Sequence, residues 1–319
     1  MFLGVDGGQS STIAVIGDET GKIVGWATSG PCNHTSGEEG RRKFVRVLRE
    51  CVGHAATNAG LDPARLHFRA ACLGMSGGPD DKAGLLAQVF TADHLTVTTD
   101  GRIAHAGALS GKPGVIVIAG TGSFVYGENA TGEVARAGGW GYIFGDEGGA
   151  FNIVRQALRA TLREQEGWGP RTALTPALVE AAEARDPNHA LHLFYTPDWP
   201  RSRVAQLAKL VSRLAEEGDP VAVNILHGEA QHLATYAAAV RRRLWRDEES
   251  VQVSWAGGVF TSPILLDRFR ALIELADSDV CQPPAHNPAA GALTLALRSA
   301  GISSVSASSP AKTDRPEAS

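Results

Sequence analysis

Residues 2–28 read FLGVDGGQSSTIAVIGDETGKIVGWAT, and this stretch decides the fold of the chain. It contains three apolar runs separated by glycine-rich turns, at residues 2–6, 11–17 and 22–28. Runs of this kind between such turns predict a meander of three short strands. The apolar spacing that follows predicts a helix at 39–60, a strand at 67–74, a helix near 81–90 and a strand at 94–99, followed by another helix.

The same order begins again at residue 114, which indicates an internal repeat. GVIVIAG at 114–120 and SFVYG at 123–127 predict two strands, and a third is expected near 133–136. Aligning Gly7 with Gly120 gives an offset of 113, and aligning Gly21 with Gly132 gives 111. Two hairpins can resemble each other by chance, but a shared order and a nearly constant offset favour duplication. Two facing α/β domains would flank a cleft, where ligands commonly bind.

The remaining sequence completes the second domain. Helices are predicted at 147–163, 202–244 and 263–276 and after Pro288, and a buried strand at 251–256. A proline-rich stretch at 164–200 is expected to be an insertion at the rim of the cleft. The predicted domains are residues 1–112 and 113–302, and the polar segment 303–319 is expected to be a disordered tail.

Composition limits the classes of partner. The 319 residues carry a net charge of −4, and no basic cluster predicts binding to nucleic acid or to an anionic membrane. Small-molecule partners are therefore favoured. The four cysteines lie far apart without a CxxC pair, which argues against a zinc site or a disulfide framework. No signal peptide or membrane span is evident, so we expect a soluble, cytoplasmic protein.

The first glycine-rich hairpin, DGGQSST at 6–12, has the residue types that bind a phosphate. Gly7 and Gly8 let backbone N–H groups approach closely, and Ser10 adds a hydroxyl donor at the exit of the turn. The carboxylate of Asp6 could hold a hydrated Mg²⁺ beside the phosphates. By itself, a tight turn that only reverses the chain is the simpler explanation of this hairpin.

The second hairpin, AGTGS at 119–123, has the same composition at the same place in the repeat. Gly120, Thr121 and Gly122 form its turn, and Ser123 follows. Two such turns at matching positions are hard to explain as two coincidences. Together they predict a split site for the phosphates of a nucleotide.

The stretch GGWGYIFGDEGG at 138–149 predicts a ligand-binding loop. Glycine loses the most backbone entropy on folding, so a stretch this rich in glycine is a costly choice for a plain connector. Asp146 could accept hydrogen bonds from sugar hydroxyls, with Trp140 as an apolar wall. Equally, Asp146 could cap the helix that follows.

Three further segments have both a functional and a purely structural explanation. TTDG at 98–101 places Asp100 where a strand ends, and its carboxylate could accept a proton from an attacking hydroxyl or could cap a helix. Asn33, in the loop NHT at 33–35, could contact a hydroxylated ligand but fits ordinary turn chemistry better. VQVSWAGGV at 251–259 could bring backbone close to an adenine ring or could be a simple strand-to-helix turn.

Together these motifs resemble the acetate-kinase, sugar-kinase, heat-shock-protein-70 and actin superfamily. Within it, the chain is similar to the N-acetylglucosamine kinase branch of the BadF/BadG/BcrA/BcrD ATPase family. The resemblance covers nearly all of residues 1–300. It is carried by GVDGGQSST at 4–12, NH at 33–34, LGMSGG at 73–78, TTD at 98–100, AGTGS at 119–123 and, most specifically, GGWGYIFGDEGGA at 138–150.

The resemblance implies two ribonuclease-H-like domains of the actin-like ATPase type around a cleft that binds ATP, Mg²⁺ and a sugar. It makes Asp100 the catalytic base for the sugar 6-hydroxyl and Asp6 the acidic residue near the metal. The sugar-binding positions that it matches are Asn33, Ser123, Gly139, Trp140 and Asp146. On the ATP side, beside the hairpin residues Gly7, Gly8, Gly120 and Gly122, it matches Ser10, Thr121, Ala205 and Gly258.

The expected activity is phosphorylation of an aminosugar by ATP, with N-acetylglucosamine or glucosamine as the acceptor and N-acetylmuramic acid or another hexose as alternatives. A homodimer is implied by the resemblance only. Phe124 follows Ser123 where mammalian-type relatives tend to have a polar residue, so recognition of the N-acetyl group is left open.

Two other classes of function fit the resemblance less well. The family also contains ATP-driven activators of reductases or dehydratases, but these need cysteines near the second hairpin to hold an iron–sulfur cluster. This chain has no cysteine between Cys72 and Cys281. A non-catalytic sugar sensor is the third class, and the presence of Asp100 argues against it.

Overall fold

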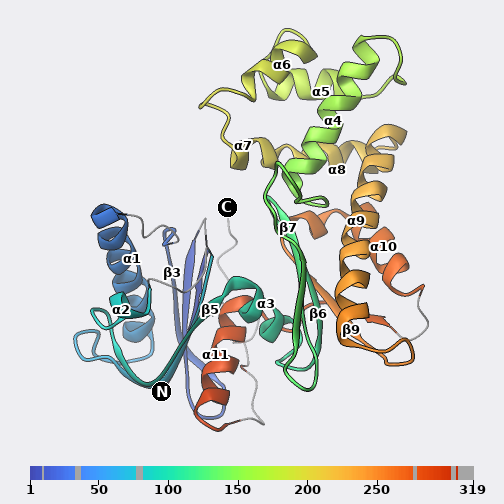
Figure 1. Cartoon of the computed structure of the whole chain (residues 1–319). Coiled ribbons are helices and arrows are strands. Elements are labelled where there is room, and N and C mark those ends of the chain that lie inside the picture. The colour runs from blue at the N-terminus through green and yellow to red at the C-terminus, as the bar shows by residue number, and fades with distance from the viewer. Residues whose placement is uncertain (9–10, 33–36, 77–81, 276–278, 303–306, 308–319) are drawn as a thin grey trace. The chain divides into compact units, whose positions relative to one another are not determined.

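The computed structural model describes residues 1–8, 11–32, 37–76, 82–275, 279–302 and Ala307. They form two compact units (Figure 1). Unit 1 comprises Met1–Pro113 together with the segment from Pro283 onward, and unit 2 comprises Gly114–Gln282. Each unit contains a five-stranded mixed sheet.

Unit 1 is a sheet of order β3-β2-β1-β4-β5. The first three strands are antiparallel, and β4 and β5 run parallel to β1. The strands are β1 (Phe2–Gly7), β2 (Thr12–Gly17), β3 (Ile23–Ser29), β4 (His67–Met75) and β5 (Thr91–Thr99). The helices are α1 (Gly37–Asn58), α2 (Ala83–Leu86), α3 (Asp100–Ala108) and α11 (Pro288–Ser299).

Both faces of this sheet are covered, as the alternation along β1 requires. Helices α1 and α11 lie on opposite faces of the sheet (Figure 1). Leu3 and Val5 pack in the core beneath α1, whereas Phe2 packs in the core formed with α11. Gly4 allows α11 to approach the strand, because a Cβ there would lie 2.6 Å from the carbonyl oxygen of Ala289.

Unit 2 repeats this topology with the sheet order β10-β9-β6-β7-β8. Its strands are β6 (Gly114–Ala119), β7 (Ser123–Glu128), β8 (Val134–Gly138), β9 (Gln252–Ala256) and β10 (Val280–Cys281). The helices are α4 (Ala150–Gln165), α5 (Leu174–Ala181), α6 (Pro187–Leu193), α7 (Arg201–Gln206), α8 (Ala208–Glu216), α9 (Pro220–Leu244) and α10 (Pro263–Ile273), with a 3-10 turn η1 (Gly258–Thr261).

Two cores hold unit 2 together. The larger lies between the sheet and the helices α8, α9 and α10, and includes Val117, Leu233 and Phe269. The smaller lies among α4, α6 and α7, around Val154 and Trp199. Because β6 to β10 repeat the order and directions of β1 to β5, the predicted duplication is confirmed.

Several predicted boundaries differ from the structure. The segment after Pro283, predicted to belong to the second domain, packs on unit 1, because α11 lies against β1, β4 and α3. The helix expected at 202–244 is three helices, α7, α8 and α9. The break before α9 falls at Gly218, which has a left-handed φ of +94°, and Asp219 caps the new helix.

The remaining differences are local. The helix expected near 81–90 is only α2, because Phe90 turns back to pack against Phe68. The stretch 164–200 contains α5 and α6, and β10 was not predicted. The predicted tail lies outside the described residues apart from Ala307, which is buried. Among the described residues, no helix is both long and apolar enough to span a membrane.

Candidate functional site

The parallel strands of unit 1 end at one edge of the sheet and bring two acidic residues together. Gly7 pairs with Met75, and Met75 pairs with Thr99, so the strand ends are in register. Asp6 therefore lies near Ser76 and Asp100, the residues that follow β4 and β5. We call Asp6, Ser76, Lys82 and Asp100 the carboxylate edge.

Asp100 is held in a defined orientation at this edge. The Ser76 hydroxyl donates to its Oδ2 at 2.9 Å, and the Gly101 amide donates to its Oδ1 at 2.8 Å. The cap of α3 is Thr99, whose Oγ1 accepts from the Arg102 amide at 3.4 Å. The capping role considered for Asp100 therefore belongs to its neighbour, and the oriented Asp100 carboxylate remains suited to act as a base.

The surroundings of Asp6 disfavour the charged form of its carboxyl group. Burial, followed by the nearby charge of Asp100, raises the pKa of its carboxyl group from 3.8 to about 6. The described residues contain no group of three or more His, Cys, Asp or Glu side chains that could hold a metal. Mg²⁺ usually binds one or two carboxylates and completes its shell with water and phosphate oxygens. Two neighbouring carboxylates fit that requirement.

Lys82 is a component of this edge that the sequence analysis missed. Its side chain is 3% exposed, and its Nζ donates to the carbonyl oxygen of Ser76 at 3.1 Å. The apolar spacing predicts a helix near 81–90, and this pattern gives no sign of a lysine that packs inward. The ammonium group supports the segment that carries the Ser76 hydroxyl.

The first hairpin is only partly described. Gly7 lies against Met75 and Cys32, where a Cβ would clash, and the Gly8 amide donates to the carbonyl oxygen of Ser11 at 2.9 Å. Both glycines thus have structural reasons to be there. Ser10 and Asn33, predicted to contact phosphate and sugar, lie outside the described residues.

The second hairpin, residues 119–123, is called here the phosphate hairpin. The first amides of α4 donate to it, from Ala150 to Gly120 at 2.9 Å and from Phe151 to Thr121 at 3.1 Å. Within the described residues, the amides of Thr121 and Gly122 donate no hydrogen bond. Two unused amides next to the positive end of a helix form a suitable site for an anion.

The glycine-rich stretch 138–149, called here the glycine loop, is fastened to the phosphate hairpin. The buried Ser123 hydroxyl donates to the carbonyl oxygen of Glu147, and the Gly139 amide donates to that of Ser123 at 3.0 Å. Gly149 lies so close that a Cβ would be 2.8 Å from the Gly122 backbone. Ser123 thus orients the loop, which places the predicted sugar residues beside the hairpin.

Asp146 lies at the point where the glycine loop meets the hairpin. Its backbone is in the left-handed region, with φ of +65°, and its carboxylate forms an ion pair with Arg201. The cap of α4 is Gly149, without a side-chain hydrogen bond. The alternative role as a helix cap is therefore wrong, and Arg201 was not found by the sequence analysis.

A buried polar network supports the loop from α9. Glu229 accepts hydrogen bonds from the Gly148 amide and from Asn152 Nδ2, and Tyr236 donates to Glu147. Burial raises the pKa of Glu229, although these hydrogen bonds oppose the change. Glu229 interrupts the apolar stripe of α9, three residues after Leu226, and this interruption was the signal that could have revealed it.

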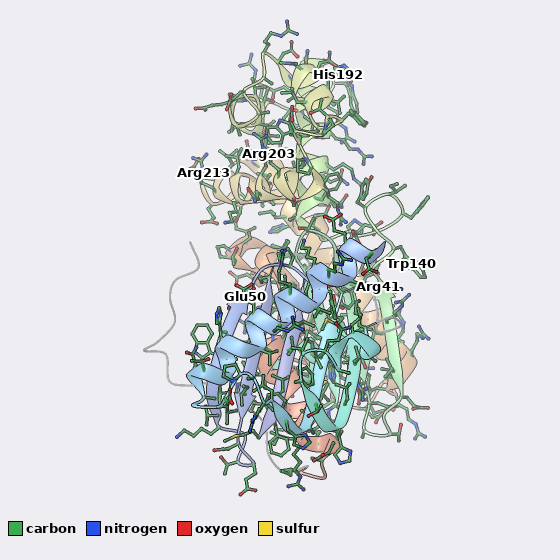
Figure 2. The ribbon with its side chains drawn as sticks, turned by 90° about the vertical axis from the view of Figure 1, so that its left-hand side faces the viewer. Arg41, Glu50, Trp140, His192, Arg203 and Arg213 are labelled. Carbon is green, nitrogen blue, oxygen red and sulfur yellow. The ribbon has the colours of Figure 1, made fainter. Side chains whose placement is uncertain are left out.

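The tip of the glycine loop exposes large apolar side chains. Trp140 is 66% exposed and Phe144 82% exposed. The position of Trp140 is labelled in Figure 2. The Arg136 guanidinium lies 5.4 Å from the centre of the Trp140 ring. Gly139 before it has φ of +74°, a conformation that favours glycine.

The turn after β9 also meets the phosphate hairpin. Gly257 has φ of +105°, and a Cβ there would lie 2.6 Å from the carbonyl carbon of Ala119. Gly258, predicted on the nucleotide side, is exposed and has open space around it. Ala205, predicted on the same side, is buried in α7, one helical turn after Arg201.

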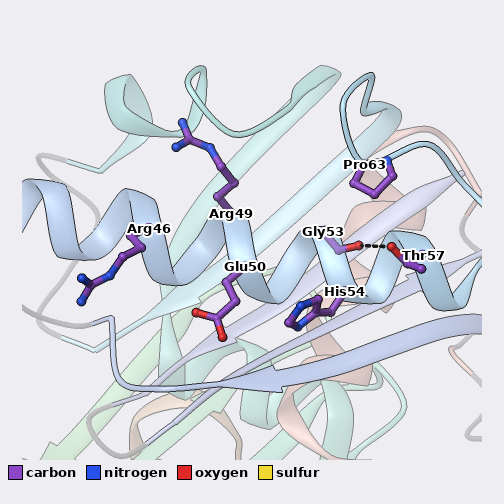
Figure 3. A pocket seen from close by; sticks show the side chains of 7 residues that line it. All are labelled: Arg46, Arg49, Glu50, Gly53, His54, Thr57 and Pro63. Carbon is purple, nitrogen blue, oxygen red and sulfur yellow. Dashed lines mark hydrogen bonds between the residues drawn. The ribbon is translucent and has the colours of Figure 1, made fainter.

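A hollow elsewhere on unit 1 shares no residue with these groups. It has a volume of about 360 Å³ and lies along α1 (Figure 3). Charged side chains of both signs line it, namely Arg46, Arg49 and Glu50, as is common on a solvated helix face. None of the residues predicted from the sequence lines it.

The duplicated sheets place the protein in the class of actin-like ATPase folds. A model of the BadF/BadG/BcrA/BcrD ATPase family matches residues 3–296, so the chain belongs to that family.

Named relatives agree with this assignment. The chain is 30% identical over 279 residues to an N-acetylmuramic acid/N-acetylglucosamine kinase of Clostridium acetobutylicum, covering 86% of this chain and 90% of the relative. It is also 30% identical to an N-acetyl-D-glucosamine kinase of Dictyostelium discoideum, covering 81% and 85%. A solved structure from Chromobacterium violaceum, described as a candidate N-acetylglucosamine kinase, has a TM-score of 0.74 and 27% identity, covering 93% and 98%.

Gly257→Ala is expected to destabilise unit 2. The new Cβ must occupy a left-handed backbone position and would clash with Ala119, so we expect a loss of about 1–3 kcal/mol in the free energy of unfolding. Urea denaturation measures this loss. Gly258→Ala is the matched control and should cost much less, because nothing lies within 4 Å of its Cβ position. Equal losses for the two variants would contradict the expectation.

Asp6→Asn is expected to stabilise the cation-free protein in a pH-dependent way. The folded pKa of about 6 exceeds the unfolded value, so the wild type loses stability as pH rises from about 4 to 6. The variant should therefore gain about 3 kcal/mol relative to wild type at pH 8, and little at pH 4. Urea denaturation with a chelator at both pH values measures the gain.

Asp18→Asn provides a control of opposite sign. The hydrogen bond from the Thr20 hydroxyl lowers the pKa of Asp18, so its contribution to stability is present above the unfolded pKa and is lost at lower pH. This variant should lose stability relative to wild type at pH 8. A gain for Asp6→Asn that is the same at pH 4 and pH 8 would show that the Asp6 charge is not the cause.

Proposed function

We propose that this protein is an ATP-dependent kinase that phosphorylates the 6-hydroxyl group of an aminosugar, with N-acetylglucosamine as the first candidate. The observation that carries the proposal is the oriented carboxylate of Asp100 beside Asp6. The names of the family relatives, all kinases of aminosugars, support the choice of substrate.

In this proposal Asp100 is the general base. The sugar oxygen forms a bond to the γ-phosphorus, the bond from that phosphorus to the bridging oxygen breaks, and ADP leaves with the electron pair. The hydroxyl proton moves to the carboxylate of Asp100. Hydrogen bonds from Ser76 and Gly101 hold this carboxylate in one orientation, so that its oxygens are placed to accept the proton.

The ATP phosphates are assigned to the glycine hairpins. The unused amides of Thr121 and Gly122 support phosphate binding at the second hairpin. Asp6 would hold Mg²⁺, which when bound supplies positive charge to the phosphate oxygens. The other proposed ATP positions are Gly7, Gly8, Ser10, Gly120, Ala205 and Gly258.

The sugar is assigned to the glycine loop. Asp146 offers a carboxylate to sugar hydroxyls, and the exposed ring of Trp140 offers an apolar face. Asn33, Ser123 and Gly139 complete the proposed set. The homodimer and the cytoplasmic location remain predictions.

Release of ADP by the wild-type protein tests the proposal directly. A coupled assay with Mg·ATP and N-acetylglucosamine, N-acetylmuramic acid, glucosamine or glucose should show sugar-dependent ADP release, highest with an N-acetylated or free aminosugar. Absence of sugar-dependent release with all four sugars would overturn the proposed function.

Asp100→Asn is expected to lower kcat by about 10²- to 10⁴-fold with little change in the KM for the sugar, because a positioned base typically contributes this much. Asp93→Asn is a suitable control, since Asp93 lies on the same strand, β5, and pairs with His67 at the surface. It should retain the wild-type kcat. A folded Asp100→Asn variant with most of the wild-type kcat would show that Asp100 is not the base.

A further inference from the structure

The carboxylate of Asp146 and the guanidinium of Arg201 form an ion pair beside the phosphate hairpin. Nη2 of Arg201 donates to Oδ2 of Asp146, and the two side chains are 34% and 8% exposed. The residues are 55 positions apart, and Arg201 begins α7. Because the Asp146 carboxylate is buried, loss of Arg201 would leave it without a charge partner, which is unfavourable.

The guanidinium of Arg201 is fixed from several sides. It lies 5.2 Å from the ring centre of Tyr142 in the glycine loop and 5.9 Å from that of Phe151 in the first turn of α4. These rings pack edge to face, 5.3 Å apart. Cation–π contacts of this kind favour one placement of a side chain that is otherwise flexible.

The ion pair also lies directly against the phosphate hairpin. A Cβ on Gly122 would be 2.6 Å from Arg201 Nη2 and would clash with the Asp146 carboxylate. A larger residue at position 122 would therefore displace the side chains of the pair. Displacement of the guanidinium would therefore also disturb the contact between the glycine loop and the hairpin.

One acceptor atom and one donor atom of the ion pair have no hydrogen-bond partner among the described residues. Oδ2 of Asp146 is held by Arg201, whereas Oδ1 accepts no hydrogen bond within the described residues. Nε of Arg201 is buried and likewise has no partner there. An unsatisfied buried donor is costly unless a ligand or water completes it, and the second oxygen of the Asp146 carboxylate can accept a further hydrogen bond.

We propose that Arg201 is a positioning residue that fixes the Asp146 carboxylate against the phosphate hairpin so that its free oxygen can accept a hydrogen bond from the sugar. This inference rests on the proposed sugar kinase function. Arg201 is assigned to act on sugar binding through Asp146, and not on the nucleotide.

The test compares Arg201→Met with Arg203→Met in the full-length protein. Arg203 is a matched control, because it lies on the same helix but stacks on Trp199 at 3.9 Å and donates to the carbonyl oxygen of Asp198. Arg201→Met should raise the KM for the accepted sugar about 10- to 100-fold, the effect expected of a misplaced binding group, with a much smaller change in kcat and in the KM for ATP. Arg203→Met should match wild type in all three values.

The conservative variant and the double variant separate positioning from general damage. Arg201→Lys keeps the charge without the planar fork and should recover part of the lost sugar affinity. If Arg201 acts through Asp146, adding Arg201→Met to Asp146→Asn should raise the sugar KM little beyond that of Asp146→Asn alone. A double variant whose loss equals the product of the two single losses would overturn the inference.

Folding is monitored by circular dichroism and urea denaturation in the same preparations. A KM does not depend on the fraction of folded enzyme, so a purely structural role would lower stability and leave the sugar KM unchanged, which would also overturn the inference. If Arg201→Met does not fold, Arg201→Lys carries the test, and a wild-type sugar KM would contradict the positioning role. Wild-type protein inactive with every sugar would overturn the proposed function itself, whereas active wild type with an unaffected Arg201→Met variant would overturn this inference alone.

Discussion

The backbone contact between Gly122 and Gly149 is the constraint on which the rest of unit 2 depends. Because neither residue has a side chain, the end of the glycine loop can lie against the phosphate hairpin, where a Cβ on Gly149 would be 2.8 Å from Gly122. The contact brings the first amides of α4 to the hairpin carbonyls. The positive end of α4, the hairpin amides and the Asp146–Arg201 pair are thereby assembled in one place. A larger residue at position 149 would clash with the Gly122 backbone, and one at position 122 with the Asp146–Arg201 pair.

The two copies of the repeat have diverged in charge at equivalent positions. Asp6 precedes the glycines of the first hairpin, whereas Ala119 precedes those of the second. Unit 1 therefore has carboxylates at the ends of its strands. Unit 2 has the backbone amides of the phosphate hairpin and the Asp146–Arg201 ion pair there. This difference has a simple electrostatic reason. An unpaired carboxylate in place of Ala119 at the phosphate hairpin would repel an anion that the amides attract. The two units thus share a sheet topology but present different chemistry at the equivalent strand ends.

Local signals made most of this architecture predictable. The sheets and hairpins follow from turn residues and apolar spacing, and the positions of Asp6 and Asp100 follow from the rule that parallel strands end at one edge. Contacts between distant segments were not predictable in this way. Arg201 reaches Asp146 across 55 residues, Glu229 reaches Gly148 across 81, and α11 returns to the first sheet after the whole of unit 2. None of these partners leaves a local pattern, apart from the interruption that Glu229 makes in an apolar stripe.

The glycine loop shows why such distant partners are needed. A loop with so many glycines has a large conformational entropy in the unfolded chain, and its own sequence provides few side chains to order it. Three side chains from outside the loop hold it by hydrogen bonds. Glu229 accepts from the Gly148 amide, Tyr236 donates to Glu147, and Arg201 donates to Asp146. Because these contacts are made by the protein itself, they reduce the cost of ordering the loop that ligand binding energy would have to offset. The same glycines that let the backbone approach the hairpin thus leave the loop to be ordered by side chains elsewhere in the unit, among them the buried carboxylate of Glu229.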